Sequence, residues 1–397
     1  MKIKQKPEDF VVTELDRYEL SGTGPFALYR LVKWDIGTLE AVRNLGRNWN
    51  LSGAQISFGG LKDRHARTEQ TISIRGGPER NFDGSSFRVQ YLGRSRDPIS
   101  RASFQGNRFE VTIRDLRELP DLEPLRRFGV PNYFDDQRFG SLRGTGGEFI
   151  GRALVRGEYE KALRLAIASP SAQDRKHERE LRIRLRDRWG DWAALGKELP
   201  PSTERSIALY LAGRPGAFGF AFELLDQNLR LLILSAYQSW LWNRTLAALI
   251  RNLPDPYEVE YAAGRHVFYR SLGAADHDRL AELAIPLLTP SQKFEGQIAE
   301  IVGALLREEQ IEQRQFRLKK LAKTYFGKGL RDALIAPAGL QSRTGPDELH
   351  PGKRRLTLSF ELPKGAYATI LLKRLFHAPL PAEAGEDELD SARPAES

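Results

Sequence analysis

The sequence "ISFGGLKDRHARTEQTISI" (residues 56–74) places a charged loop between two apolar runs that have the composition of β-strands. The loop holds one carboxylate, Asp63, among four potential cations. These cations are Lys62, Arg64, His65 and Arg67. The loop is either a solvated turn, in which the neighbours screen Asp63, or the carrier of a catalytic carboxylate kept ionised in a site for an anionic substrate. The spacing alone leaves both interpretations open.

The segments around this loop predict an α+β fold for the first 145 residues. Runs rich in aromatic and β-branched residues predict strands, and apolar side chains at helical spacing predict helices. The expected strands cover residues 8–15, 26–34, 87–93 and 108–115, and the expected helices cover 38–49 and 122–129. Thr38 is a candidate helix cap.

From about residue 146 the pattern becomes mainly helical. The predicted helices cover residues 157–169, 204–213, 229–253 and 296–326, with a strand-like patch at 265–272. Strand character returns at 355–363, and a late strand needs an earlier sheet to join. We therefore predict one domain inserted into another. Residues 1–145 and 345–378 form the outer α+β domain, 146–344 form the insertion, and 379–397 form an acidic disordered tail.

Charge and composition narrow the class of protein. Lys and Arg number 61 against 52 Asp and Glu, which gives a net charge of +9 and a pI near 9.6. Because six acids and one Arg lie in the tail, the rest of the chain carries about +14 and attracts polyanions such as nucleic acid.

The residue types that are missing also carry information. A chain without cysteine has no disulfides and no thiolate metal site, and its six histidines lack ligand-like spacing. No apolar run is long enough to span a membrane, and the basic N-terminus lacks the apolar core of a signal peptide. We therefore expect a monomer of the cytoplasm that uses no metal, no cofactor and no membrane.

Aromatic and polar residues crowd together at three separate strand or helix ends. These stretches are "KPEDF" (6–10), "PNYFDDQRFG" (131–140) and "ELPKGAYATI" (361–370). Any single aromatic among them could simply belong to the core. Together, aromatic rings beside amides and cations suit an unstacked nucleobase, which needs a surface to stack on and partners for its hydrogen-bonding edge.

Five segments in this order resemble the TruD family of tRNA pseudouridine synthases. They are "KPEDFVVTE" (6–14), "GLKDRHARTEQ" (60–70), "VPNYFDDQRFG" (130–140), "SAYQSWLWN" (235–243) and "LPKGAYAT" (362–369). The resemblance implies a pseudouridine-synthase catalytic domain, with a mixed, mainly antiparallel sheet flanked by helices, and an inserted, mostly helical TRUD domain. It also implies isomerisation of a uridine in tRNA, in bacteria typically the one at position 13.

The resemblance also implies roles for individual residues. The catalytic aspartate of the family falls on Asp63. Its uridine-contacting positions fall on Phe10, Asn132 and Tyr367, with Phe134 in the same pocket. One stretch departs from the family: relatives carry a basic run where this chain reads "RSRDPISRASFQGNRF" (94–109), which keeps the glycine and asparagine of the pattern but few of its cations.

The reaction breaks the N1–C1′ bond of uridine and joins C5 to C1′, so it needs neither a redox group nor an energy source. Its carboxylate must be ionised, and neighbouring cations favour that state. We expect Lys62 and Arg64 to meet RNA phosphates at the same time. A predicted basic helix at 314–331, with Lys319, Lys320 and Lys323, is a second candidate for RNA contact.

Two other functions compete with this interpretation. A non-catalytic RNA-binding or RNA-chaperone protein could share the fold, but such a protein would be free to lose Asp63. A glycosidase-like hydrolase would need paired carboxylates around the bond, for which Asp135 and Asp136 could supply a second acid.

Overall fold

The computed structural model describes residues 1–140, 147–171, 174–319, 321 and 323–378, so the predicted tail at 379–397 lies outside the described residues. The described chain forms two compact units. The sheet unit comprises Met1–Val130 and Ile335–Phe376, and the helical unit comprises Pro131–Leu334 together with His377. The chain therefore changes unit at residues 130/131 and 334/335, earlier than the predicted domain borders at 145/146 and 344/345.

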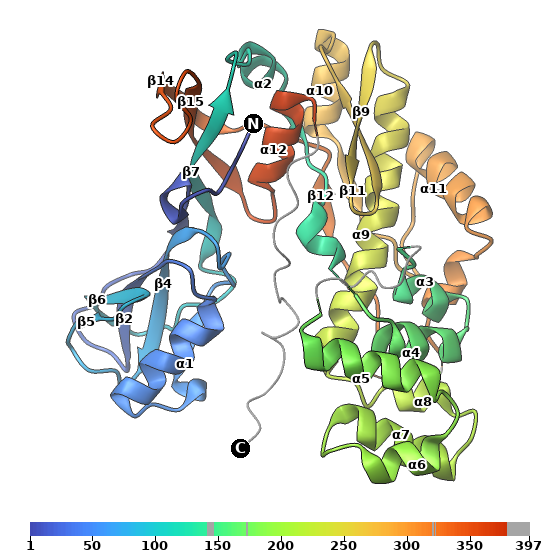
Figure 1. Ribbon diagram of the computed structural model, residues 1–397. Helices are drawn as coiled ribbons and strands as arrows, with labels where there is room; N and C mark the ends of the chain where they lie inside the picture. Colours follow the sequence, from blue (N-terminus) through green and yellow to red (C-terminus); the bar gives the residue numbers. More distant parts are fainter. Residues whose placement is uncertain (141–146, 172–173, 320, 322, 379–397) are drawn as a thin grey trace. The chain divides into compact units, whose positions relative to one another are not determined.

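The sheet unit is built on a nine-stranded sheet with the order β14-β15-β7-β1-β4-β2-β6-β5, in which β3 also pairs with β4 (Figure 1). Its strands are β1 (Phe10–Asp16), β2 (Phe26–Lys33), β3 (Ile56–Phe58), β4 (Arg67–Arg75), β5 (Phe82–Asp83), β6 (Phe87–Ser95), β7 (Phe104–Leu116), β14 (Ala338–Pro346) and β15 (Arg354–Pro363). Its helices are α1 (Thr38–Trp49), α2 (Glu123–Phe128) and α12 (Ala368–Phe376). The predicted α+β class and mainly antiparallel sheet are confirmed.

Helix α1 covers one face of this sheet. Its apolar side chains pack with those of β2, β4 and β6, as the spacing predicted. The helix N-cap is Gly37, so Thr38 is not the cap that the sequence suggested. Thr38 is the first helical residue instead, and its hydroxyl serves the charged loop described below.

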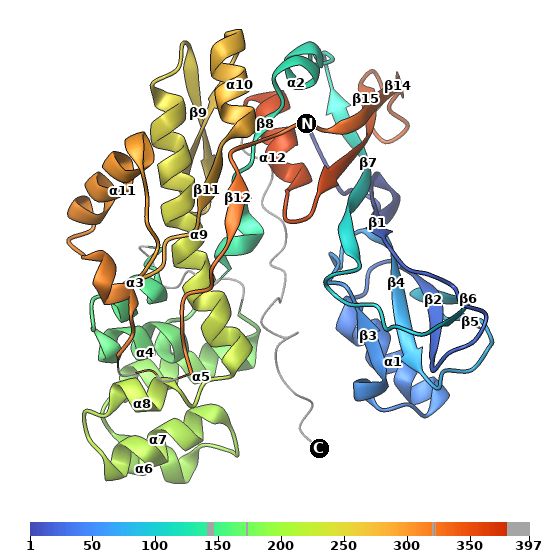
Figure 2. The same cartoon turned by 180° about the vertical axis from the view of Figure 1, so that it is seen from behind.

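The parallel pairing of β1 with β4 fixes the surroundings of the charged loop. Val11 of β1 lies opposite Arg67 of β4, so both strands begin at the same end of the sheet. β3 occupies the same edge of β4 further along, where Ile56 pairs with Ile74 (Figure 2). The loop of residues 59–66 must therefore return past the start of β1, and this brings the N-terminal segment beside it.

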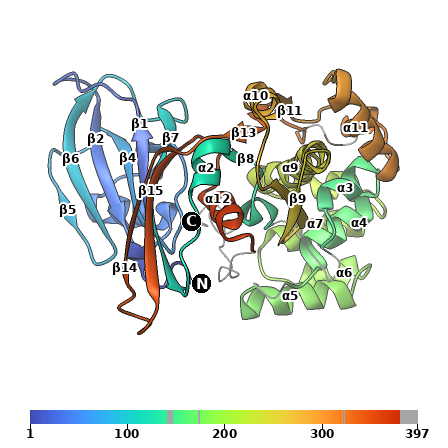
Figure 3. The same ribbon diagram turned by 90° about the horizontal axis from the view of Figure 1, so that it is seen from above.

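The C-terminal strand joins the early sheet, as predicted. β15 pairs antiparallel with β7 over ten residues of the chain, with Phe360 opposite Phe109. β14, which no sequence pattern indicated, extends the sheet beyond β15 (Figure 3). Gly106 lies where β7 meets the end of β15. Only glycine fits at this position, because an added Cβ would stand 2.4 Å from the carbonyl oxygen of Leu362.

The helical unit surrounds one long helix, α9 (Gln227–Arg251), which is seen nearly end-on in Figure 3. Its other helices are α3 (Ile150–Val155), α4 (Tyr159–Ala168), α5 (Lys176–Asp187), α6 (Trp192–Glu198), α7 (Thr203–Gly213), α8 (Phe218–Phe222), α10 (Ala274–Glu282) and α11 (Gly296–Glu308). Its short strands are β9 (Pro256–Tyr261), β10 (Gly264–Tyr269), β11 (Ala284–Pro286) and β12 (Leu330–Asp332). Two further short strands, β8 (Val130–Pro131) and β13 (Leu334–Ile335), contain the residues at which the chain changes unit.

The predicted basic helix at 314–331 does not form. Helix α11 ends at Glu308, a 3-10 turn follows at Gln313–Phe316, and the chain then runs irregularly to β12. Its apolar residues Leu318, Leu321, Tyr325 and Phe326 do recur at helical spacing, but the structure buries Thr324 and exposes Tyr325. Tertiary packing therefore overrides the helical pattern of the sequence and the helical propensity of its Lys and Leu residues.

No helix within the described ranges combines the length and the apolar character needed to cross a bilayer.

A buried ion pair ties the charged loop to the sheet. The Lys62 ammonium contacts the Glu14 carboxylate of β1, and the two side chains are 6% and 0% exposed. The ammonium also lies 4.4 Å from the centre of the Phe104 ring. Burial raises the pKa of Glu14 to about 7, while Lys62 lowers it and the neighbouring Asp16 raises it.

The raised pKa of Glu14 predicts that the free energy of unfolding depends on pH. Its ordinary pKa is 4.5 and its folded pKa is about 7. Between these pH values the folded chain binds one proton more than the unfolded chain, so the free energy of unfolding falls as the pH rises. The contribution is about 3 kcal/mol across the window, since one pKa unit corresponds to about 1.4 kcal/mol.

Glu14→Gln should remove this dependence, because the amide does not titrate and its oxygen can still accept from Lys62. Denaturant unfolding at pH of about 5 and about 7 tests the expectation. From the lower to the higher pH, the free energy of unfolding should fall by up to about 3 kcal/mol more in wild type than in the variant. Glu69→Gln, at a partly exposed carboxylate paired with Arg30, is the matched control. Equal pH slopes for wild type and Glu14→Gln would contradict the assignment.

Candidate active site

Asp63 lies in the loop between β3 and β4, and its carboxylate is held from two sides. Oδ1 accepts a hydrogen bond from the backbone N–H of His65 at 2.9 Å. Oδ2 accepts one from the Lys4 ammonium. The Asp63 and Lys4 side chains are only 10% and 8% exposed. A carboxylate removed from water to this extent needs a partner to remain charged, and Lys4 supplies it.

A second lysine fixes the backbone of the same residue. Lys33, at the end of β2, is fully buried, and its ammonium donates to the carbonyl oxygen of Asp63 at 2.5 Å. Lys4 itself has a left-handed backbone conformation with φ of 52°, which non-glycine residues seldom adopt. The N-terminal segment thus bends in an unfavourable way while its ammonium remains on the Asp63 carboxylate.

Side chains of α1 and β4 also form hydrogen bonds with the loop. The Thr38 hydroxyl accepts from the backbone N–H of Lys62 at 3.0 Å and donates to Gln70 Oε1 at 3.1 Å. The Gln70 amide donates to the carbonyl oxygen of Gly60 at 3.0 Å. Gly59 lies so close to Glu14 that a Cβ would stand 2.9 Å from its Oε1. These contacts give the residues flanking Asp63 a fixed backbone.

Phe10 begins β1 and lies against the same lysine. The Lys4 ammonium is 4.6 Å from the centre of the Phe10 ring, which is 5% exposed and also meets Phe109 edge-on at 6.2 Å. The Phe10 ring and the Asp63 carboxylate therefore flank one ammonium group. The structure brings these two predicted site residues together through Lys4, which the sequence did not single out.

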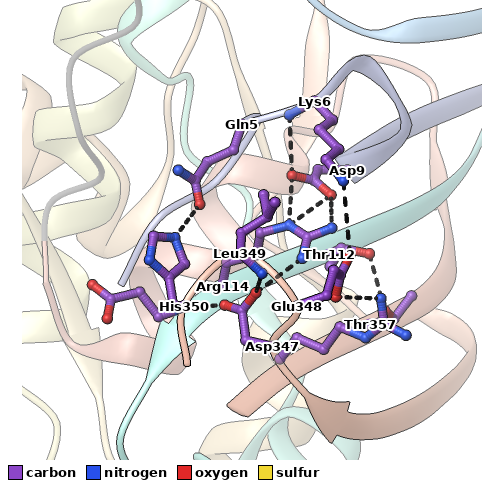
Figure 4. Close-up of polar contacts among 12 residues, drawn as sticks. Gln5, Lys6, Asp9, Thr112, Arg114, Asp347, Glu348, Leu349, His350 and Thr357 are labelled. Atoms are coloured by element: carbon purple, nitrogen blue, oxygen red, sulfur yellow. Dashed lines mark hydrogen bonds and ion pairs between the residues drawn. The ribbon is translucent and has the colours of Figure 1, made fainter. Parts of the chain in front are cut away.

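A buried arginine fixes the turn that precedes Phe10 (Figure 4). The Arg114 guanidinium of β7 donates to both oxygens of Asp9 at 2.7–2.9 Å and to Asp347 at 3.1 Å. The side chains of these three residues are at most 4% exposed. Asp9 also accepts from the backbone N–H of Lys6 at 3.1 Å. The network therefore joins the N-terminal segment to β7 and to the turn before β15.

Tyr367 lies in the sheet unit at the start of α12, half-buried. Its carbonyl oxygen accepts from the backbone N–H of Ile370 at 3.2 Å, which begins the helix. The preceding turn is attached to β7, since the backbone N–H of Lys364 donates to Gln105 at 3.1 Å. Its role at a uracil stays a prediction.

Asn132 lies in the helical unit, in the loop after β8, where Arg331 of β12 holds it. The Arg331 guanidinium donates to the Asn132 carbonyl oxygen at 2.6 Å, to its Oδ1 at 2.7 Å and to the carbonyl oxygen of Tyr133 at 3.0 Å. The backbone N–H of Asn132 donates to Ala333 at 2.9 Å. The side-chain oxygen of Asn132 is therefore engaged, and its amide nitrogen is the group that this contact leaves as a donor for a base.

Phe134 is fixed by α9 and stacked on the same arginine. The Asn243 side chain accepts from the Phe134 backbone N–H at 2.9 Å and donates to its carbonyl oxygen at 2.8 Å. The Phe134 ring lies 4.1 Å from the Arg331 guanidinium and meets Trp242 edge-on at 5.6 Å. The segment "SAYQSWLWN" thus supports the loop rather than any reacting group.

The structure assembles the predicted site residues as two groups. Asp63 and Phe10 form one in the sheet unit, and Asn132 and Phe134 form the other in the helical unit. Whether both groups enclose a single uracil stays a prediction. Asp136, considered as a second acid for a hydrolase, accepts from the backbone N–H of Ala262 at 2.6 Å and so fixes a turn.

The two cations next to Asp63 differ in exposure, and the buried Lys62 does not fit the expectation that it meets phosphates. Lys62 is buried against Glu14, which leaves its ammonium no exposed surface of any size. Arg64 is exposed and pairs with Glu40 of α1 at 2.6 Å. Its side chain remains 44% exposed and so is available to RNA.

Sequence reasoning missed the four residues that hold these groups, namely Lys4, Lys33, Asn243 and Arg331. Each acts on a residue at least 30 positions away. Lys4 appeared only as one of several cations in "MKIKQK", and Arg331 as one of many in a basic stretch. Two signals were available: Asn243 ends the quoted segment "SAYQSWLWN", and Lys33 ends an apolar strand, where a buried ammonium needs an oxygen partner.

Comparison with known proteins gives a consistent result. The family model described as "tRNA pseudouridine synthase D (TruD)" matches residues 1–375. A protein of Aquifex aeolicus named tRNA pseudouridine synthase D is 33% identical over 390 residues, covering 95% of this chain and 98% of its own length. One of Methanococcus maripaludis, named probable tRNA pseudouridine synthase D 1, is 31% identical, covering 95% of this chain and all of its own.

A solved structure agrees with these relatives. The crystal structure of the putative tRNA pseudouridine synthase D of Methanosarcina mazei superposes with a TM-score of 0.72 at 28% identity, covering 95% of this chain and 94% of that one. A match of the family model over nearly the whole chain, together with relatives above 30% identity, shows the family. The chain belongs to the TruD family of tRNA pseudouridine synthases.

Proposed function

We propose that this protein isomerises a uridine of tRNA to pseudouridine, with Asp63 as the catalytic carboxylate. The observation that carries the proposal is the pairing of a nearly buried Asp63 carboxylate with the Lys4 ammonium, beside the Phe10 ring. An ionised, fixed carboxylate next to an aromatic surface is what the reaction requires of a protein. The relatives named above are described as enzymes of this kind.

The reaction rearranges bonds within one nucleotide. The N1–C1′ bond breaks, the uracil turns, and C5 bonds to C1′ while the hydrogen on C5 leaves and N1 gains one. Atoms and electrons balance without an oxidant, a reductant or a cosubstrate. We infer from this chemistry that the protein works without metal or cofactor. We further propose that it acts as a monomer, in the cytoplasm where tRNA is found.

Three roles are open to the Asp63 carboxylate. It can stabilise the sugar cation that forms when the N1–C1′ bond breaks, attack C1′ covalently, or remove a proton from the sugar. Each role needs the charged form in a fixed position. Lys4 and the His65 N–H restrict both oxygens, and Lys33 restricts the backbone, so little reorganisation accompanies the reaction.

The detached uracil needs a site that permits rotation. Phe10 and Tyr367 from the sheet unit, with Asn132 and Phe134 from the helical unit, are proposed to bind it. Stacking on aromatic rings tolerates rotation in the plane of the base, whereas several fixed hydrogen bonds would oppose it. The Asn132 amide can hold one edge of the base before and after the turn. In bacterial relatives the resemblance points to the uridine at position 13.

Contacts with the tRNA backbone are proposed at exposed cations. Arg64 adjoins the catalytic aspartate and is 44% exposed. Lys319 and Lys323 are exposed on the irregular segment that precedes β12, and Lys320 lies outside the described residues. Lys62 is omitted from the interface because it is buried.

Asp63→Asn should abolish pseudouridine formation, because the neutral amide can neither stabilise a sugar cation nor act as nucleophile or base. The rate of formation in a tRNA transcript at saturating tRNA should fall by about a thousandfold or more. Affinity for tRNA should change little. The matched control is Asp83→Asn, at an exposed aspartate of β5 that pairs with Arg88.

A rate for Asp63→Asn within about tenfold of wild type would exclude Asp63 as the catalytic group. The same assay separates the competing function. A wild-type chain that binds tRNA tightly and forms no pseudouridine in any tRNA would instead be a non-catalytic RNA-binding protein with this fold.

Replacing Lys319 and Lys323 together with Ala should weaken tRNA binding by removing two phosphate contacts. The slope of log affinity against log salt should become less steep by about 1.5 units, since each contact contributes about 0.7 to 0.9. All tRNAs should be affected alike, because phosphate contacts carry no base specificity. Lys197→Ala, at an exposed lysine of α6, is the control. An unchanged slope would show that this segment does not touch RNA.

A further inference from the structure

The chain before β12 is irregular, with a turn at Leu318–Leu321, and its described side chains divide between core and solvent. Its inward-facing residues are Phe316, Leu318, Leu321, Thr324 and Phe326. Its outward-facing residues include Arg317, Lys319, Lys323, Tyr325 and Lys328. The second set contains four cations and one aromatic ring, and no acid.

The positions around Tyr325 are anchored to the helical unit. The Thr324 hydroxyl accepts from the buried Arg230 guanidinium at 2.8 Å. Phe326 packs on Phe316 with ring centres 4.8 Å apart. The carbonyl oxygen of Gly327 accepts from the Gln238 amide of α9 at 2.8 Å. The backbone on both sides of Tyr325 is thus fixed by buried contacts.

Tyr325 itself points outward. It is 62% exposed, more than any other aromatic side chain in the described ranges, and its ring meets no other ring and no cation there. Large aromatic side chains usually bury most of their surface, so an anchored backbone that presents one to solvent is unusual. The arrangement leaves one face of the ring open to a flat ligand.

The neighbouring cations are also without acidic partners. In the parts of the chain that the structure describes, Arg317, Lys319, Lys323 and Lys328 form no ion pair, whereas the nearby Arg314 pairs with Glu312. The nearby Glu223 carboxylate accepts from the backbone N–H of Lys323 at 2.9 Å rather than from its ammonium. An exposed ring among unpaired cations matches a nucleotide, which offers a flat base and a negative phosphate.

We propose that Tyr325 is a stacking platform for an unpaired nucleobase of the tRNA substrate, with Lys323 and Lys328 on the adjoining phosphates. This inference rests on the proposed function and adds a second point of contact to it. Every base has a face that can stack, so the platform selects unpaired nucleotides over paired ones without reading their identity.

The position of Tyr325 along the chain places the contact near the proposed uracil-binding loop. Arg331, which holds Asn132 and stacks on Phe134, follows six residues after Tyr325. Six residues span at most about 21 Å even when fully extended. A nucleotide on Tyr325 and a base held by Asn132 are therefore close enough in space for one tRNA molecule to reach both.

The test compares Tyr325→Ala with Tyr325→Phe, because Phe keeps the stacking face and Ala removes it. Tyr325→Ala should weaken tRNA binding by about 5- to 150-fold, the range measured for loss of one stacked base. Its salt slope should equal that of wild type, since a ring releases no counterions. Tyr325→Phe should bind within about twofold of wild type. The rate at saturating tRNA should be the same for all three chains.

Phe220→Ala, at a 59% exposed aromatic residue of α8, controls for the loss of any exposed ring. Three results would overturn the inference: unchanged binding by Tyr325→Ala, an equal loss in Tyr325→Phe, or an equal loss in Phe220→Ala. If any one of these results appears while wild type forms pseudouridine, the inference is wrong and the proposed function is unaffected. A wild-type chain that binds tRNA through Tyr325 and forms no pseudouridine would contradict the proposed function instead.

Discussion

The structure depends on one constraint, which is that a carboxylate taken almost out of water must be compensated. Asp63 is 10% exposed, and Lys4 meets it from a segment that precedes it by 59 residues. That pairing requires β1 to begin beside the loop, and the parallel register of β1 with β4 provides this. Lys33 and the Glu14–Lys62 pair add buried charge around the same loop. Buried ion pairs contribute little net stability, so their value here lies in fixing the position of a functional group.

The helical unit uses the same strategy with different chemistry. Its loop of residues 132–134 carries amide and aromatic groups, and one guanidinium with one side-chain amide holds the backbone. Arg331 satisfies two successive carbonyl groups, and Asn243 satisfies both backbone groups of Phe134. Backbone groups fixed in this way cannot relax toward a ligand, so a base would meet a site already formed. The long helix α9 and the strand β12 are thus supports for a short recognition loop.

The sequence was informative where local patterns decide the outcome and uninformative where distant residues meet. Aromatic and β-branched composition or alternation predicted strands of the early sheet and the late strand β15, and helical spacing predicted α1. The loop around Asp63 was recognisable because its carboxylate and its cations are neighbours in the sequence. By contrast, charge alone could not tell that Lys62 is buried and Arg64 exposed. The segment 314–331 has helix-forming residues and helical spacing, yet no helix forms there, because contacts with α9 bury Phe316 and Thr324 and leave Tyr325 exposed. Lys4 and Arg331 are recognisable only once the fold brings them to their partners.

The central claim is that this protein converts a uridine of tRNA to pseudouridine. The most direct measurement maps pseudouridines at single-nucleotide resolution in tRNA from cells that have the gene and from cells that lack it. The account predicts that at least one tRNA position carries pseudouridine only when the gene is present, and that pseudouridine reappears at this position when the gene is restored. Identical pseudouridine maps of all tRNAs in the two cell lines would contradict the account.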